Sequence, residues 1–188
     1  MLNIIMILLC LFSFASYAAN PNDLAKLPKL INPKGLDLSN ADLRAYQFSP
    51  GKIDLRSANL SHANLTNVNM ANMDLSHADL SYATLTNADF TNANLSAANL
   101  KHADLTNATL SKANLSNAQL NFAVLVGANL QQTNLNKADF SCANFNGANV
   151  TGADFLETTI SSATFTNTIT NDILNYISVV DEHVTCTG

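Results

Sequence analysis

A histidine and a cysteine near the C-terminus are spaced as metal ligands can be. His183 and Cys186 are three residues apart, and Asp181 and Glu182 precede them. Imidazole, thiolate and carboxylate groups are the ligands that zinc prefers. So few such residues in a terminal tail form only a weak motif, and we therefore predict no metal site.

The residue types of hydrolytic triads, serine, histidine and aspartate, all occur in the chain. Their positions follow from a repeat, however, and the motifs G-x-S-x-G and H-E-x-x-H and a glycine-rich phosphate loop are all missing from the sequence. With only 6 glycines in 188 residues, a phosphate-binding loop is further disfavoured. We predict no catalytic residue, no cofactor and no enzymatic activity.

The first 18 residues have the pattern of an export signal. An apolar run from Ile4 to Ala15 is interrupted only by Ser13, and Ser16-Tyr17-Ala18 places small residues at −3 and −1 of a cleavage site. The run is shorter than the roughly 20 residues of a membrane span. We predict a Sec-type signal peptide over 1–18, an extracytoplasmic (periplasmic or secreted) location, and no membrane span after cleavage. Because Lys and Arg are absent from the segment, an uncleaved anchor is the alternative.

Export would allow the two cysteines of the mature chain to form a disulfide. These are Cys142 and Cys186. Their spacing alone does not show whether they are bonded, so both states remain open at this point.

A repeat of five residues determines the positions of most polar side chains in the sequence. From Leu55 to Phe165 every fifth residue, 23 in all, is Leu, Met, Phe, Val or Ile. The residue two before each of these centres is usually Ala, the residue between is mostly Asn or Asp, and the next two are mostly polar. This period matches neither a helix (about 3.6) nor a strand (about 2). It predicts a very short strand followed by a turn, repeated without interruption.

A chain that turns the same way every five residues winds into stacked coils. Each unit then buries one small and one large side chain, and its backbone groups pair with the coils above and below. Alanine at the first inward position is expected, because a narrow interior has no room for two large groups per unit.

The pattern resembles the pentapeptide-repeat family, whose motif reads A-[DN]-L-x-x, as in Ala58-Asn59-Leu60. The resemblance covers residues 54–166. It implies an all-β fold, a right-handed quadrilateral β-helix with four repeats per coil, so that residues 20 apart lie above one another. Leu38, Leu43 and Phe48 continue the spacing out of phase, which predicts a two-residue insertion in a loop at 49–52.

The segments outside the repeat predict short helical caps at both ends of the solenoid. We assign residues 19–35 to an N-terminal cap, 36–168 to the solenoid and 169–188 to a C-terminal helix and tail. The helix is predicted over Asn171 to Val180, since apolar residues recur there at intervals of three and four. The resemblance implies that such an element can form a homodimer interface, and a simple cap is the alternative.

The family geometry places one column of larger side chains on a single face. Its members are His62, Tyr82, His102, Phe122, Cys142 and Ser162. Val124 and Val126 lie beside Phe122 at outward positions that are usually polar. Tyr82, His102, Phe122, Val124 and Val126 therefore form a candidate partner-binding patch. The alternative is that these side chains only stack along the column and stabilise it.

Charge separates two functional hypotheses. The net charge of −5, with 12% charged residues, disfavours a nucleic-acid partner. The first hypothesis is an exported non-enzymatic scaffold or protein-interaction module with an unidentified protein partner. The second, implied by the resemblance, is a DNA mimic that binds DNA gyrase. Mimicry needs dense negative charge, yet the residue before the centre is Asp in only seven of the 23 units, and export would separate the protein from gyrase.

Overall fold

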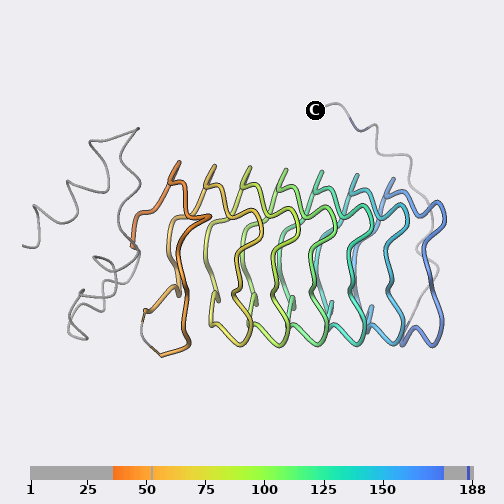
Figure 1. Cartoon of the computed structure of the whole chain (residues 1–188). Coiled ribbons are helices and arrows are strands. Elements are labelled where there is room, and N and C mark those ends of the chain that lie inside the picture. Colours follow the sequence, from red (N-terminus) through yellow and green to blue (C-terminus); the bar gives the residue numbers. More distant parts are fainter. Residues whose placement is uncertain (1–35, 52, 176–185, 187–188) are drawn as a thin grey trace, which may run out of the picture.

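The computed structural model describes residues 36–51, 53–175 and 186. The predicted signal peptide, the predicted N-terminal cap and most of the predicted C-terminal tail lie outside these residues. The described chain winds into a stack of similar coils, each lying directly on the one before (Figure 1). Among the described residues, no helix has the length and apolar character needed to cross a membrane.

Each coil consists of four five-residue units. Parallel β-bridges join residues 20 apart along the stack, from Asn59 with Asp79 to Asp154 with Leu174. Every bridge is a single residue long, so the described part of the chain has neither a helix nor a longer strand whose bounds could be given. The repeating element of this β-solenoid is therefore the unit of one bridge and one turn.

Two side chains of every unit fill the interior. All centres from Leu55 to Val150 are fully buried, and the alanines two residues before them are 0–1% exposed. Burying a leucine side chain contributes about 1.5–3 kcal/mol. The columns of centres and alanines therefore provide most of the favourable free energy of folding.

Threonine replaces the inward alanine at two buried positions without leaving a polar group unpaired. The Oγ1 atoms of Thr133 and Thr158 donate hydrogen bonds to the carbonyl oxygens of Leu110 and Leu135, each at 2.8 Å. A buried hydroxyl without a partner would be costly. The hydrogen bonds explain why the repeat tolerates threonine here.

A tight turn closes every unit. The amide of Ala58 donates to the carbonyl of Leu55 at 3.1 Å, and Ser57 between them has a φ of 57°. A positive φ at the third residue is the feature of a type II turn, and it favours Gly and Asn over other residues. This requirement explains the abundance of Asn and Gly at the second residue after the centre.

The loop at 49–52 accommodates two additional residues. Before it, the bridges join Asp37 with Asn59 and Asp42 with Asn64, which are 22 residues apart rather than 20. Gly51 lies in a turn of this loop with a φ of 74°. The stack thereby continues in register on both sides of the insertion.

The predicted C-terminal helix is wrong over residues 171–175, and residues 176–180 lie outside the described chain. Asp172 lies in another turn of the solenoid, and the amide of Leu174 donates to the carbonyl of Ala153 at 2.9 Å. The carbonyl of Leu174 in turn accepts from the amide of Phe155 at 3.0 Å. A helix starting at 171 would leave these groups of the preceding coil unpaired. The solenoid therefore extends beyond 168 to Leu174.

Candidate partner-binding surface

One corner of the solenoid carries four rings in a continuous stack, which we call the aromatic column: His62, Tyr82, His102 and Phe122. The successive ring centroids are 4.9, 4.6 and 4.8 Å apart, with interplanar angles of 4°, 6° and 2°. These distances match the spacing of neighbouring strands, about 4.8 Å. The rings are parallel because each side chain leaves the same turn position of its coil.

Stacking covers the faces of the rings and leaves their edges in contact with solvent. Tyr82 is 52% exposed although a histidine ring lies against each of its faces. His102 and Phe122 are half-buried. A sugar or nucleobase that binds by stacking would find both faces of Tyr82 and His102 occupied. Tyr82 and His102 therefore present polar ring edges rather than stacking platforms.

An apolar band extends from the last ring of the column across the adjacent side of the solenoid. We define it as Phe122, Val124 and Val126, all half-buried. Val124 forms its bridges with Asp104 and Asn144, which occupy the same position in the neighbouring coils. The band is thus one coil wide and is bordered by polar side chains.

Two glycines follow the far end of the apolar band. Gly127 follows Val126 at the next corner, and Gly147 lies at the same corner one coil later, with φ values of 67° and 71°. A Cβ atom at Gly127 would lie 2.5 Å from Oδ1 of Asn107. Neither glycine projects a side chain beside Val126. Neither glycine was among the site residues predicted from the sequence, although Gly at the second residue after the centre marks both turns.

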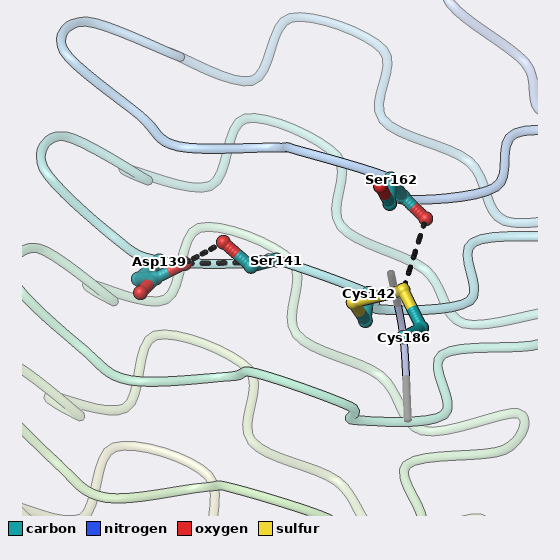
Figure 2. Close-up of a disulfide and its surroundings, with 5 residues drawn as sticks. All are labelled: Asp139, Ser141, Cys142, Ser162 and Cys186. Carbon is teal, nitrogen blue, oxygen red and sulfur yellow. Dashed lines mark hydrogen bonds between the residues drawn. A yellow bond between two sulfur atoms is a disulfide. The ribbon is translucent and has the colours of Figure 1, made fainter. Parts of the chain in front are cut away.

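A disulfide ends the column beyond Phe122. Cys142 occupies the next position at this corner and is bonded to Cys186, with 5.7 Å between the Cα atoms (Figure 2). Sγ of Cys186 lies 4.0 Å from the carbonyl oxygen of Ser162, one coil further. This is a contact rather than a hydrogen bond, because a disulfide sulfur carries no proton. The structure thus joins the two cysteines whose pairing was open from the sequence.

Asp139 lies three residues before Cys142, and the pKa of its carboxyl group departs from the ordinary value. Burial raises the pKa of Asp139, but hydrogen bonds outweigh this effect and hold the pKa below its ordinary value. Ser141 donates to Oδ1 of Asp139 from its hydroxyl at 2.6 Å and from its amide at 2.9 Å (Figure 2). Asn121 and Lys101 lower the pKa further. The carboxylate is therefore a structural element of its turn.

Metal binding finds no support in the described part of the chain, where no three His, Cys, Asp or Glu side chains gather closely enough to hold an ion. His62 and His102 are separated by the ring of Tyr82. Of the tail residues considered as ligands, Cys186 is bonded to Cys142, and His183, Asp181 and Glu182 lie outside the described residues.

Comparison with protein families identifies the repeat. A model described as pentapeptide repeats matches with 8 copies over residues 53–92, 88–121, 118–155 and 138–169. Together these matches cover more than half of the chain. No curated protein matches the chain.

Solved structures share the architecture. The crystal structure of Rfr23, a pentapeptide repeat protein from the cyanobacterium Cyanothece 51142, is 28% identical, covers 62% of this chain and 90% of its own, and has a TM-score of 0.54. QnrB1, a plasmid-mediated fluoroquinolone resistance protein, is 21% identical, covers 74% and 76% of the two chains, and has a TM-score of 0.59. At this identity the likeness to QnrB1 shows the fold alone.

Proposed function

The chain belongs to the pentapeptide-repeat family, which is known for right-handed β-helices, and from this premise we propose that it is an exported, non-enzymatic scaffold that binds a protein partner. The proposed contact surface is the aromatic column together with the apolar band. Proteins of this family generally act as structural or interaction modules. The observation that carries the proposal is the apolar band on a side that is otherwise polar.

The backbone conformation of the repeat requires neither aromatic residues in the column nor valines in the apolar band. Tyr82 and Phe122 have φ values of 58° and 61°, a region in which bulky residues are disfavoured by about 1–2 kcal/mol. Asn or Gly would fit these turns better, and Asn, Asp, Ser or Thr is usual where Val124 and Val126 stand. Stacking of the rings offsets part of this cost. It does not account for the two valines, which favours a binding role for the band.

A protein fits this surface better than a nucleic acid or a sugar. The net charge of −5 opposes binding of a phosphate backbone. The faces of Tyr82 and His102, on which a base or a sugar would stack, are covered by other rings. A partner with an apolar side chain for the band and polar groups for the ring edges matches both features.

Export is supported by two independent features. The N-terminal segment up to Ala18 has the pattern of a cleavable signal. A disulfide between Cys142 and Cys186 is the kind of bond that persists outside the reducing cytoplasm. Fractionation of the native host and mass spectrometry of the N-terminus test this part. We expect a chain beginning at Ala19 or Asn20 outside the cytoplasm; a cytoplasmic chain that retains Met1 would contradict export.

DNA mimicry remains the second candidate, and the charge of the coils disfavours it. Few units carry an acidic residue before the centre, and Arg44 and Arg56 neutralise two of these, Asp42 and Asp54, through contacts of 2.6 Å. A mimic of DNA needs a dense negative surface. We expect no inhibition of gyrase supercoiling at micromolar protein, and clear inhibition would favour mimicry over the proposed scaffold.

Site-specific crosslinking tests the contact surface. A photo-crosslinking residue at position 126 lies in the apolar band, and one at position 131 occupies the same place in the next unit, on the following side. We expect one defined protein adduct from position 126 in the native host, and none from position 131. Replacing the band by ordinary repeat residues, Phe122→Asn with Val124→Asn, should abolish a crosslink from position 126. Equal adducts from both positions would contradict the proposal.

A further inference from the structure

The last coil of the solenoid is its least buried part. We define the last coil as residues 155–174. The centres Ile160 and Phe165 are only half-buried, whereas every centre from Leu55 to Val150 is fully buried. At the outward position before the centre, Asn149 and Asp154 are half-buried, whereas Ile169 and Leu174 one coil later are 48% and 54% exposed. A terminal coil packs against one neighbouring coil instead of two, so its contribution to stability is correspondingly small.

The disulfide closes a loop of the chain that contains the last coil. Cys142 lies in the preceding coil, Cys186 follows the last coil in sequence, and 44 residues separate them. Sγ of Cys186 also contacts the carbonyl oxygen of Ser162 within the last coil (Figure 2). The covalent bond therefore connects the body of the solenoid to the chain that follows the last coil in sequence.

From this arrangement we infer that the Cys142–Cys186 disulfide is a redox-sensitive clamp on the last coil. In the oxidised protein the bond holds residues 155–174 against the stack. Reduction releases the C-terminal end, and the last coil then opens while the preceding coils stay folded. The inference does not depend on the proposed partner-binding surface.

The chemistry is thiol–disulfide exchange with a dithiol reductant. A thiolate of the reductant attacks Sγ of Cys186, which belongs to an exposed residue, while Cys142 is half-buried. The S–S bond breaks, Cys142 leaves as a thiolate, and a mixed disulfide forms on Cys186. The second thiolate of the reductant then releases Cys186, so that the reductant becomes a disulfide and both cysteines end as protonated thiols.

Opening would uncover a defined edge of the preceding coil. The amides of Phe140, Phe145 and Val150 donate to carbonyl oxygens of the last coil at 2.7, 2.8 and 2.9 Å. The ring of Phe145 stacks on that of Phe165 with 4.8 Å between centroids. Without the last coil these donors and the Phe145 ring face solvent. An edge of this kind favours pairing with another chain.

Hydrogen exchange measured by mass spectrometry tests the clamp on the intact, oxidised protein. After addition of a dithiol reductant we expect five amides whose carbonyl partners lie in the last coil to exchange roughly tenfold faster, because removing the crosslink makes local opening more frequent. These are the amides of Phe140, Cys142, Phe145, Gly147 and Val150. Peptides from residues 80–120 should not change. The double variant Cys142→Ser/Cys186→Ser should exchange like the reduced protein and should not respond to reductant.

Three outcomes would overturn the inference. The first is unchanged exchange in residues 140–150 after complete reduction, which thiol alkylation verifies. The second is faster exchange of equal size in residues 80–120, which would make the bond a stabiliser of the whole solenoid. The third is an equal response of the double variant to reductant, which would assign the effect to the reagent.

Discussion

Individual side chains of this protein are defined by their place in the five-residue unit. A buried threonine is tolerated where its hydroxyl reaches a backbone carbonyl, as at Thr133. A turn carboxylate such as Asp139 accepts hydrogen bonds from the residues that follow it. The same position in another coil makes the same kind of bond, for example between Asp89 and the amide of Thr91 at 2.9 Å. Residue effects therefore carry over from one coil to the next.

Asp139 should make stability depend on acid. Its folded pKa is lowered below the usual value of about 3.9, so the carboxylate contributes stability above the unfolded pKa. That contribution is lost as the pH falls through the folded pKa. In urea titrations between pH 7 and acid, we expect Asp139→Asn to be less stable than the wild type at pH 7, with a difference that shrinks at low pH. A difference that does not change with pH would contradict the role of the carboxylate.

The turn is the element that determines which residues fit between the short bridges. Every unit from Leu55 to Phe165 has a positive φ at the second residue after its centre, and this conformation is adopted by Asn, by Gly or, with some strain, by other residues. The aromatic column occupies the same turn position. Its rings stack because successive turns lie above one another, so the column is a property of the turns as much as of the rings.

Ala97 provides a test of the turn strain. It has a φ of 55°, a conformation that Asn and Gly adopt more easily than Ala. We expect Ala97→Asn to raise the free energy of unfolding by about 0.5–1 kcal/mol. Thermal and urea denaturation measure this change. Ala98→Asn, which places a polar side chain at a fully buried position, is the matched control and should be strongly destabilising. Destabilisation by Ala97→Asn would contradict the strain argument.

Substitutions of Gly127 and Gly147 can separate the cost of a positive φ from the cost of a close contact with a neighbouring side chain. At Gly147 an added Cβ would meet only a backbone nitrogen at 3.9 Å, whereas at Gly127 it would lie 2.5 Å from Asn107. Gly147→Ala should cost about 1–2 kcal/mol from the positive φ alone. Gly127→Ala should cost somewhat more, because Asn107 has to move. Equal losses in denaturation experiments would show that Asn107 adjusts freely.

The whole molecule is a one-dimensional stack in which each coil depends on its neighbours. The centres in the middle of the stack are fully buried, and the centres toward its described C-terminal end are more exposed. The disulfide lies at the boundary between these two regions, since Cys142 belongs to the coil that precedes the half-buried centres Ile160 and Phe165. Stability and redox response are therefore expected to differ along the stack rather than to be uniform.

Two truncations of large side chains test this gradient. Leu100 is a fully buried centre in the middle of the stack, and Leu100→Ala should cost about 2–5 kcal/mol. Ile160 is a half-buried centre of the last coil, and Ile160→Ala should cost clearly less. Urea denaturation of the oxidised protein measures both. A larger loss at Ile160 would mean that the end of the solenoid is as well packed as its middle.

Much of the fold was determined by the sequence itself. The five-residue period predicts which side chains face inward, since a unit of one bridge and one turn must bury its first and third residues. Val124 and Val126 could be recognised as exceptions to a polar pattern without coordinates. The shift in phase before Leu55 predicted an insertion of two residues, because the period on either side is the same.

Pairing at the C-terminal end of the stack was decided only by the tertiary structure. The apolar spacing at Ile173 and Leu174 predicted a helix, but the open backbone of the preceding coil pairs with this segment instead, and a pattern of side chains carries no information about such a partner. Likewise, the sequence contains both cysteines but not the path that brings Cys186 to Cys142. A period describes one unit, and pairing at the end of a stack depends on what the neighbouring coil leaves unpaired.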